Sequence, residues 1–219
     1  MQESLFNISN NLCYYIVDSN LETNIDTNIL SKSELRKFNR FRKKEDALTF
    51  YYGRKILYRY QQENNPINLQ QIQIGEYGKP FISGKPFFFN ISHSNPYVAV
   101  AFSKGNEVGI DIEQIPKRSK IELLKMAKIV FSENEIAELQ QLSDKASKKY
   151  FTRLWVLKES YIKLKGKGFY IDTKEIIFQN IESLKPKLIS PLENEINFEL
   201  RVWQNEFYIC TAYVKYRNI

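Results

Sequence analysis

The sequence predicts an α+β protein made of two similar α/β halves in a pseudo-twofold arrangement, each a long helix packed on a small, mainly antiparallel sheet. Apolar runs of strand length alternate with longer stretches in which apolar residues recur at the helical period. Leu30 to Leu35 also matches Phe131 to Ile136 in pattern, and each precedes a long, aromatic-rich helix that is followed by strands. This repeat indicates a degenerate duplication, with residues 1–105 and 106–219 as the two halves.

The first half opens with a predicted strand at Cys13 to Val17. Ser31 and Glu34 have the spacing of a capping box, in which each side chain satisfies a free backbone N–H of the other's turn, so a helical region should begin near residue 32. That region runs to Tyr60 and ends before Pro66. The strands predicted after it are Leu69 to Ile74, Phe87 to Ile91 and Tyr97 to Phe102, with Ser92 to Pro96 as the hairpin loop between the last two.

The second half opens with Val108 to Glu113, where apolar and polar residues alternate strictly, as in a strand. Ser132 and Glu135 form a second capping box. A long helix over Phe151 to Leu164 stops at Gly166-Lys167-Gly168. The remaining predictions are a helix at Ile121 to Val130, strands at Glu175 to Phe178, Ile196 to Trp203 and Phe207 to Val214, and a polar loop at 184–194.

The composition is that of a folded protein without a histidine- or cysteine-based metal site. Apolar residues make up 43% of the chain and include 15 Phe and 14 Tyr, which argues against disorder. The single His excludes a multi-histidine metal cage, and Cys13 and Cys210, which lack ligand spacing, are expected to be buried free thiols. No apolar run approaches the ~20 residues of a membrane span, and the N-terminus lacks the features of a secretory signal. We therefore expect a cytoplasmic protein with no membrane partner.

The charge balance favours an anionic partner. The chain has 32 Lys+Arg against 25 Asp+Glu, a formal net charge of +7. This charge suits nucleic acid, a phosphorylated cofactor or an acidic protein, and it does not choose among them. The basic segment 36–44, in which Phe38 and Phe41 lie between the cations, is compatible with a solvated helix face or with a phosphate or nucleic-acid contact.

The long helix has three charged residues on or beside its apolar face. Lys158 falls inside the apolar arc, where an unpaired ammonium is costly. Glu159 and Lys163 lie four residues apart along the edge of that arc, so they are either a solvated ion pair or parts of a binding site. An anionic partner is the simplest explanation for Lys158.

Two carboxylates project from one face of the strand at Val108 to Glu113. Asp111 and Glu113 are about 7 Å apart along an extended strand, and they repel each other unless a cation lies between them. Oxygen ligands without histidine or thiolate fit Mg²⁺ or Mn²⁺, and Glu159 offers a third carboxylate. The common alternative is an Asp-x-Glu pair on a solvated strand.

Five motifs follow one another along the chain. They are Tyr77-Gly78-Lys79-Pro80, Phe89-Asn90-Ile91-Ser92-His93-Ser94, Gly109-Ile110-Asp111-Ile112-Glu113, Phe131-Ser132, and Trp155-x-x-Lys158-Glu159-Ser160-x-x-Lys163-x-x-Gly166-Lys167-Gly168. In type, order and spacing they resemble the 4'-phosphopantetheinyl transferase superfamily. The resemblance is to the long, surfactin-synthetase-activating (Sfp-like) type, in which one chain holds two similar halves.

The resemblance implies an enzyme that transfers the 4'-phosphopantetheine arm of coenzyme A to a serine of an apo acyl or peptidyl carrier protein and releases adenosine 3',5'-bisphosphate. It implies Mg²⁺ ligands at Asp111, Glu113 and Glu159, and catalytic roles for Asp111, Glu159 and Lys163. The coenzyme A contacts it implies are Lys79, Pro80, Ser92 and His93, with Lys37, Arg42 and Arg54 as candidates for the 3'-phosphate. From its place inside the apolar arc, Lys158 is expected to reach the pyrophosphate or a neighbouring carboxylate.

Two other functions stay open at the level of sequence. One is a nucleic-acid-binding module that uses the net charge of +7, and the other is a catalytically inactive relative that binds coenzyme A. The carboxylates at Asp111, Glu113 and Glu159 favour phosphoryl transfer over nucleic-acid binding, because a nucleic-acid surface gains nothing from them. Since one chain contains both halves, we expect a monomer.

Overall fold

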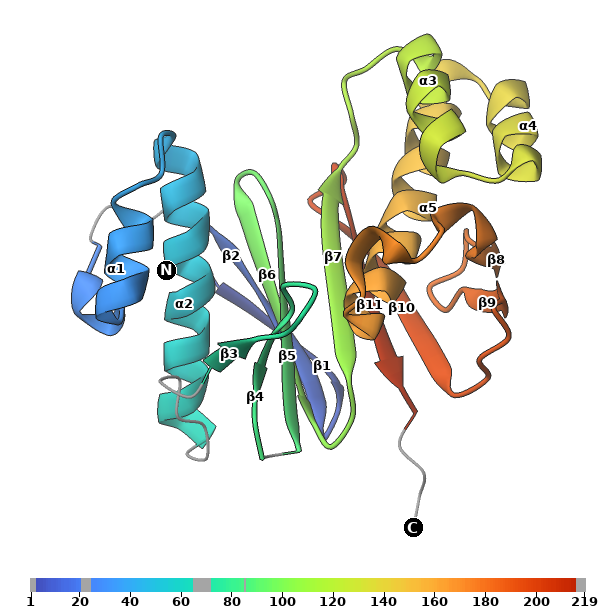
Figure 1. The fold of residues 1–219 in the computed structure, drawn as a ribbon. Coiled ribbons are helices and arrows are strands. Elements are labelled where there is room, and N and C mark those ends of the chain that lie inside the picture. The colour runs from blue at the N-terminus through green and yellow to red at the C-terminus, as the bar shows by residue number, and fades with distance from the viewer. Residues whose placement is uncertain (1–2, 21–24, 65–71, 85, 216–219) are drawn as a thin grey trace. The chain divides into compact units, whose positions relative to one another are not determined.

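The computed structural model describes residues 3–20, 25–64, 72–84 and 86–215 (Figure 1). The chain divides into two compact units, Met1–Gly105 and Asn106–Ile219. Each unit holds one long helix against an antiparallel sheet, so the predicted α+β class is confirmed. No helix of the described residues is long and apolar enough to cross a membrane.

The first unit is built on an antiparallel sheet with the strand order β1-β2-β6-β5. Its strands are β1 (Glu3–Ser9), β2 (Leu12–Asp18), β5 (Phe87–Ser94) and β6 (Tyr97–Lys104), and a small second sheet pairs β3 (Ile72–Ile74) with β4 (Pro80–Ile82). The helix α2 (Lys44–Asn64) packs on β6, where Tyr60 stacks on Phe102 with ring centroids 3.9 Å apart. Stacked aromatic rings therefore form much of the contact between this helix and its sheet.

The single helical region predicted between residue 32 and Tyr60 is two helices, α1 (Lys32–Phe38) and α2. The predicted capping box starts α1: Ser31 Oγ accepts from Glu34 N, and Ser31 N donates to Glu34 Oε2. The helix ends at Phe38, whose carbonyl accepts from Phe41 N in a tighter turn. A 3-10 turn, η1 (Thr27–Ile29), precedes it.

The second unit is built on the antiparallel sheet β10-β11-β7, with β7 (Val108–Gln114) at one edge. Its helices are α3 (Lys120–Val130), α4 (Glu133–Gln141) and α5 (Asp144–Lys165), and its 3-10 turns are η3 (Gly168–Tyr170) and η4 (Thr173–Glu175). The other strands are β8 (Ile177–Gln179), β9 (Lys187–Ser190), β10 (Ile196–Trp203) and β11 (Phe207–Val214). Both α3 and α4 begin with a Ser-x-x-Glu capping box.

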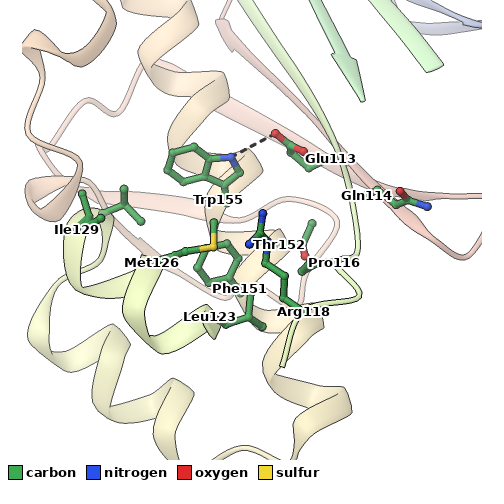
Figure 2. Close-up of a pocket in the computed structure, with 11 residues that line it drawn as sticks. Glu113, Gln114, Pro116, Arg118, Leu123, Met126, Ile129, Phe151, Thr152 and Trp155 are labelled. Carbon is green, nitrogen blue, oxygen red and sulfur yellow. Dashed lines mark hydrogen bonds between the residues drawn. The ribbon is translucent and has the colours of Figure 1, made fainter. Parts of the chain in front are cut away.

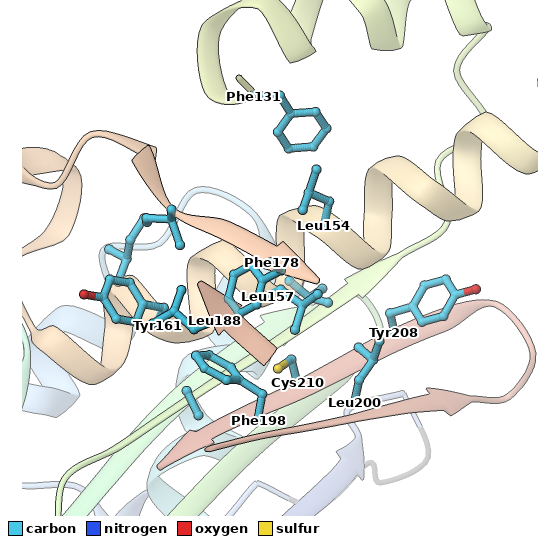
Figure 3. Packing of buried hydrophobic residues seen from close by; sticks show 14 of the residues in the cluster. Phe131, Leu154, Leu157, Tyr161, Phe178, Leu188, Phe198, Leu200, Tyr208 and Cys210 are labelled. Atoms are coloured by element: carbon cyan, nitrogen blue, oxygen red, sulfur yellow. The ribbon is translucent and has the colours of Figure 1, made fainter. Parts of the chain in front are cut away.

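The helix α5 is the centre of the second core. Its predicted end at Gly166 is confirmed, because Gly166 has a φ of 67° and occupies the left-handed C-cap position that favours glycine. Figure 3 shows Leu157 of α5 among the rings and side chains of the surrounding strands, where Phe178 meets Phe198 edge to face with centroids 4.8 Å apart. The apolar arc predicted for this helix is therefore its buried face.

The hairpin between β5 and β6 is tighter than predicted. Ser92 to Ser94 were expected in the loop, but they continue β5, with Ser92 opposite Ala99 and Ser94 opposite Tyr97 in the β5–β6 register. Only Asn95 and Pro96 remain in the turn. The polar residues are tolerated in the strand because every second one can project outward while the backbone stays in the ladder.

Several other boundaries differ from the prediction. The strand β1 was not predicted, and β9 lies inside the segment predicted to be a polar loop. Glu175 belongs to the turn η4, and the strand predicted from it begins two residues later, in β8. Of the strand predicted at Leu69 to Ile74, the part from Leu69 to Gln71 lies outside the described residues.

The strand β7 and the helix α5 approach each other closely at Gly109. A Cβ atom at Gly109 would lie 2.1 Å from the carbonyl oxygen of Ser160 and 2.4 Å from the backbone nitrogen of Leu164. Both of those atoms belong to the backbone of α5, which cannot rotate away as a side chain can. The absence of a side chain at position 109 therefore sets the distance between strand and helix.

We expect Gly109→Ala to destabilise the second unit by about 3 kcal/mol, because the added methyl group must push α5 away from the sheet. Urea denaturation followed by far-UV circular dichroism measures the loss. Gly53→Ala is the matched control: its Cβ would meet Ile91 at 3.4 Å, an ordinary contact, and alanine in a helix is favoured over glycine by ~1 kcal/mol. Equal stability of Gly109→Ala and the wild type would contradict the close approach.

Candidate active site

The candidate site is the face of β7 that packs on α5, within the second unit. Three contacts align the two elements: Gly109 lies against the backbone of Ser160 and Leu164, Asp111 against Lys163, and Glu113 against Trp155. From Asp111 to Glu113 the partner on the helix moves from Lys163 back to Trp155, so the two elements run antiparallel. The alternation of β7 thus directs Asp111 and Glu113 at the helix, as the sequence pattern predicted for a shared face.

Asp111 and Lys163 form a mostly buried ion pair. Lys163 Nζ donates to Asp111 Oδ1 at 2.5 Å, and only 3% of the Asp111 side chain is exposed. The interaction joins two motifs that are 52 residues apart in the sequence. It places a cation beside a desolvated carboxylate, an arrangement that can accept a phosphate or a metal ion in exchange.

Glu159 is a carboxylate held in an unfavourable environment. Burial raises its pKa above the usual value for glutamate; the charge of Lys163 works against that shift and the charge of Asp111 adds to it. Its Oε1 is buried and has no hydrogen-bond partner among the described residues. A buried oxygen without a partner is costly, so Glu159 is well suited to bind a proton or a cation.

Glu113 lies at the edge of the same face. Its Oε1 accepts from Trp155 Nε1 at 3.4 Å, and both residues line a pocket of about 370 Å³ between α3 and α5 (Figure 2). The other walls of this pocket are largely apolar, and they include Met126 and Ile129 of α3. The carboxylate of Glu113 therefore connects the candidate site with an apolar groove.

A complete three-carboxylate metal site is not preformed. Over the ranges that the structure describes, no group of three His, Cys, Asp or Glu side chains is close enough to hold a metal ion. The charge of Asp111 acts on Glu159, so these two carboxylates are neighbours, whereas Glu113 accepts from Trp155. The donors nevertheless fit a hard divalent cation, because they are carboxylate oxygens and one of them is buried without a partner. The predicted ligand set of Asp111, Glu113 and Glu159 stays a prediction.

The predicted contact of Lys158 with coenzyme A stays a prediction, and the structure gives this lysine other partners. Its side chain is fully buried, and its Nζ donates to Glu135 Oε2 at 2.6 Å and to the carbonyl of Thr173 at 2.8 Å. Burial lowers the pKa of Lys158, and Glu135 opposes that shift. The alternative partner predicted from the sequence, a neighbouring carboxylate, is the one that the structure provides. The pairing was missed because a capping box predicts only the local bonds of Glu135.

The motif residues of the first unit lie on its strands and hairpins. Lys79 and Pro80 stand at the end of the β3–β4 turn, which the carbonyl of Lys79 closes by accepting from Gly75 N at 2.9 Å. Ser92 is buried in β5, and the next residue, His93, is exposed. These placements leave His93 exposed and Lys79 partly exposed.

The candidates for a 3'-phosphate contact lie on and between α1 and α2. Lys37 and Arg54 approach the ring of Phe50, each at 5.0 Å from its centroid, and Arg54 Nε donates to Glu34 Oε1 at 2.5 Å. Arg42 is exposed in the connection between the two helices. The structure thus brings Lys37 and Arg54 together around one aromatic ring, while Glu34 already neutralises part of their charge.

Two family models match the two units in turn. Residues 17–105 match the model described as 4'-phosphopantetheinyl transferase, N-terminal, and residues 107–213 match that of the 4'-phosphopantetheinyl transferase superfamily. Together they span nearly all the described residues. The chain therefore belongs to the 4'-phosphopantetheinyl transferase superfamily, and its similarity to Sfp and gsp makes it one of the Sfp-like type.

Curated relatives align over about two thirds of the chain. The 4'-phosphopantetheinyl transferase gsp of Aneurinibacillus migulanus is 38% identical over 71% of this chain and 63% of its own length. The 4'-phosphopantetheinyl transferase Sfp of Bacillus subtilis (strain 168) is 38% identical over 64% of this chain and 61% of its own length. The chain thus spans just over three fifths of these relatives. A solved holo-(acyl-carrier-protein) synthase from Bacillus anthracis aligns at 23% identity with a TM-score of 0.43, covering 51% of this chain and 96% of that one.

The environment of Glu159 predicts a pH-dependent stability. Because its folded pKa is raised, the folded state binds the proton more tightly than the unfolded state, so ionised Glu159 lowers stability once the pH exceeds the unfolded value of about 4.5. We expect Glu159→Gln to have a higher urea midpoint than the wild type at pH 7, and the difference to vanish below that value. Urea titrations at pH 4, 5.5 and 7 measure it.

Glu122→Gln is the control of opposite sign. Hydrogen bonds from Ser119 lower the pKa of Glu122, so the ionised form adds stability that is lost as the pH falls through the folded pKa. This variant should be the less stable one at pH 7. A Glu159→Gln protein that is less stable than the wild type at pH 7 would contradict the unfavourable environment of Glu159.

Proposed function

We propose that this protein transfers the 4'-phosphopantetheine arm of coenzyme A to a serine of an apo acyl or peptidyl carrier protein and releases adenosine 3',5'-bisphosphate. One observation supports this above the others: two motifs far apart in the sequence meet at the β7–α5 face, where Asp111 binds Lys163 beside the buried carboxylate of Glu159. The names of the curated relatives support the same reaction.

The proposed step is a phosphoryl-type transfer that needs a base and a cation. The serine oxygen forms a new bond to the phosphorus that carries the pantetheine arm, and the bond from that phosphorus to the bridging pyrophosphate oxygen breaks. Glu159, which lies beside Asp111 on the β7–α5 face, accepts the serine proton as the general base. Lys163 places positive charge near the leaving phosphate.

A divalent cation completes the proposal. Mg²⁺, with Mn²⁺ as the alternative, would be held by Asp111 and Glu159, with Glu113 as the third ligand. When bound, the ion supplies Lewis-acid charge that stabilises phosphate oxygens. In the same proposal Lys79, Pro80, Ser92 and His93 contact coenzyme A, and Lys37, Arg42 and Arg54 are the candidates for its 3'-phosphate. The protein acts as a monomer.

The direct test mixes the protein with coenzyme A, Mg²⁺ and an apo carrier protein and follows the intact mass of the carrier. We expect a pantetheine adduct that EDTA prevents. Asp111→Ala and Glu159→Ala should each lower the rate by 10²-fold or more, on the order expected when charge stabilisation at a reacting group is lost. Glu133→Ala removes an exposed carboxylate of α4 and should change nothing.

If none of several peptidyl and acyl carriers acquired the adduct, the transferase proposal would be refuted. Coenzyme A binding without transfer would instead identify an inactive relative. Normal turnover in both the Asp111 and Glu159 variants would refute their assignment as metal ligands, provided that circular dichroism shows the variants to be folded.

The groove beside Glu113 suits the carrier protein. Apolar side chains of α3 are exposed in it, with Ile129 75% and Met126 38% accessible. Arg118 also lines the groove, and Lys125 and Lys128 are exposed on α3. An acidic helical domain can cover such an apolar patch while its carboxylates meet the lysines. Docking there brings the carrier next to Glu113 on the candidate site.

We expect Ile129→Asp to raise the KM for the carrier about tenfold, since it places a charge in the apolar part of the groove, and to leave the KM for coenzyme A unchanged. Steady-state kinetics with each substrate varied in turn measures both constants. Leu192→Asp is the matched control, because Leu192 is 70% exposed but does not line the groove. Equal effects of the two substitutions would place the carrier elsewhere.

A further inference from the structure

The ammonium of Lys158 is fixed in one position by three acceptors from three segments. Its Nζ donates to Glu135 Oε2 at 2.6 Å, to the carbonyl of Thr173 at 2.8 Å and to the carbonyl of Val130 at 3.5 Å. An ammonium has three N–H groups, so every donor has an acceptor. These acceptors belong to α4, η4 and the last residue of α3.

The partner carboxylate is equally constrained. Glu135 Oε2 also accepts from Ser132 N at 2.8 Å, as part of the capping box that begins α4. The Lys158 ammonium lies 5.1 Å from the centroid of the Phe131 ring. The pair therefore joins α5 to the start of α4 through contacts that each require a particular direction.

Stability alone does not account for a charged pair at this place. Taking two charges out of water costs several kcal/mol per ion, and replacing such a pair with apolar side chains of similar size is often neutral or stabilising. Hydrogen bonds require a particular orientation of donor and acceptor, whereas contacts between apolar side chains do not. Hydrogen bonds of Lys158 to two carbonyls and a capped carboxylate fix its side chain in one orientation, which packing alone does not require.

That orientation bears on the candidate site because the next residue is Glu159. Consecutive residues on a helix point about 100° apart, so holding Lys158 on the side of α5 that faces α4 determines the direction of Glu159 on the side facing β7. Gly109 sets how close α5 comes to β7, and the Asp111–Lys163 and Glu113–Trp155 contacts hold the helix from the side of the sheet. Lys158 holds the helix from the side that faces α4.

We propose that Lys158 and Glu135 are a positioning pair that sets the rotation of α5 and thereby directs Glu159 at Asp111. Lys158 touches no substrate in this role. The inference concerns how the site is held in place, and its consequence for turnover rests on the transferase function proposed above.

The decisive variant replaces both charges with apolar side chains of similar size, Lys158→Met together with Glu135→Leu. We expect its thermal midpoint to match or exceed that of Lys158→Met alone, which leaves the carboxylate of Glu135 buried without its ammonium. We also expect kcat for transfer to fall 10- to 100-fold, on the order expected for a misplaced catalytic group, with the KM for coenzyme A within about twofold of the wild type. If the pair had only a structural role, the double variant would regain activity along with stability.

Lys148→Met is the matched control, because Lys148 is also on α5 and pairs with Asp144 on the surface of the helix at 3.0 Å. It removes an ammonium from the same helix whose carboxylate partner, Asp144, is on that helix as well. We expect wild-type kcat and KM from it.

A second measurement follows the rotation of α5 without any turnover. Trp155 stands one turn before Glu159 and donates to Glu113 on β7, so its fluorescence reports on the contact between helix and strand. In a Trp203→Phe background the double variant should shift the Trp155 emission maximum, whereas Lys148→Met should leave it unchanged. If the wild type transfers nothing, the transferase proposal fails, but the emission shift still tests the positioning pair.

Two outcomes overturn the positioning role. One is a stable double variant with wild-type kcat, whatever its emission. The other is an emission maximum equal to that of the wild type, because α5 would then keep its orientation without the pair.

Discussion

The backbone-to-backbone approach of β7 and α5 at Gly109 is the constraint on which the rest of the second unit depends. With no side chain at that position, strand and helix come close enough for Asp111 to reach Lys163 and for Glu113 to reach Trp155. Any larger residue would separate the two elements and with them the charged groups of the candidate site. The same approach explains why Asp111 and Glu159 are desolvated, since the sheet and the helix exclude water between them.

The two lysines of the α5 motif have different environments because they lie on opposite sides of the helix. Lys163 faces the strand and pairs with Asp111 while about a quarter of its side chain stays exposed, so it can still meet a ligand. Lys158 points to the other side, is wholly enclosed and is fully occupied by Glu135 and two carbonyls. One motif thus places one lysine at the candidate site and the other in the contact between α5 and α4.

The comparison of sequence and structure is clearest at three places. The capping boxes at Ser31 and Ser132 and the glycine stop at Gly166 were predicted correctly, because each depends on bonds within a few residues. The long helical region beginning at residue 32 was predicted as one element, because the turn that ends α1 at Phe38 contains no proline or glycine, the usual sequence signals of a helix end. The hairpin loop was placed too early because polar side chains in β5 resemble a loop by composition.

The sequence by itself determined the α+β class, the ends of the main helices, the family resemblance and the shared face of Asp111 and Glu113, all of which follow from local periodicity, capping and motif order. Only the tertiary structure decided which charges meet: Lys163 with Asp111, Lys158 with Glu135, and Trp155 with Glu113. The partners in these pairs are 23 to 52 residues apart. Such contacts depend on how α5 is placed against its sheet and against α4, and no local pattern specifies that placement.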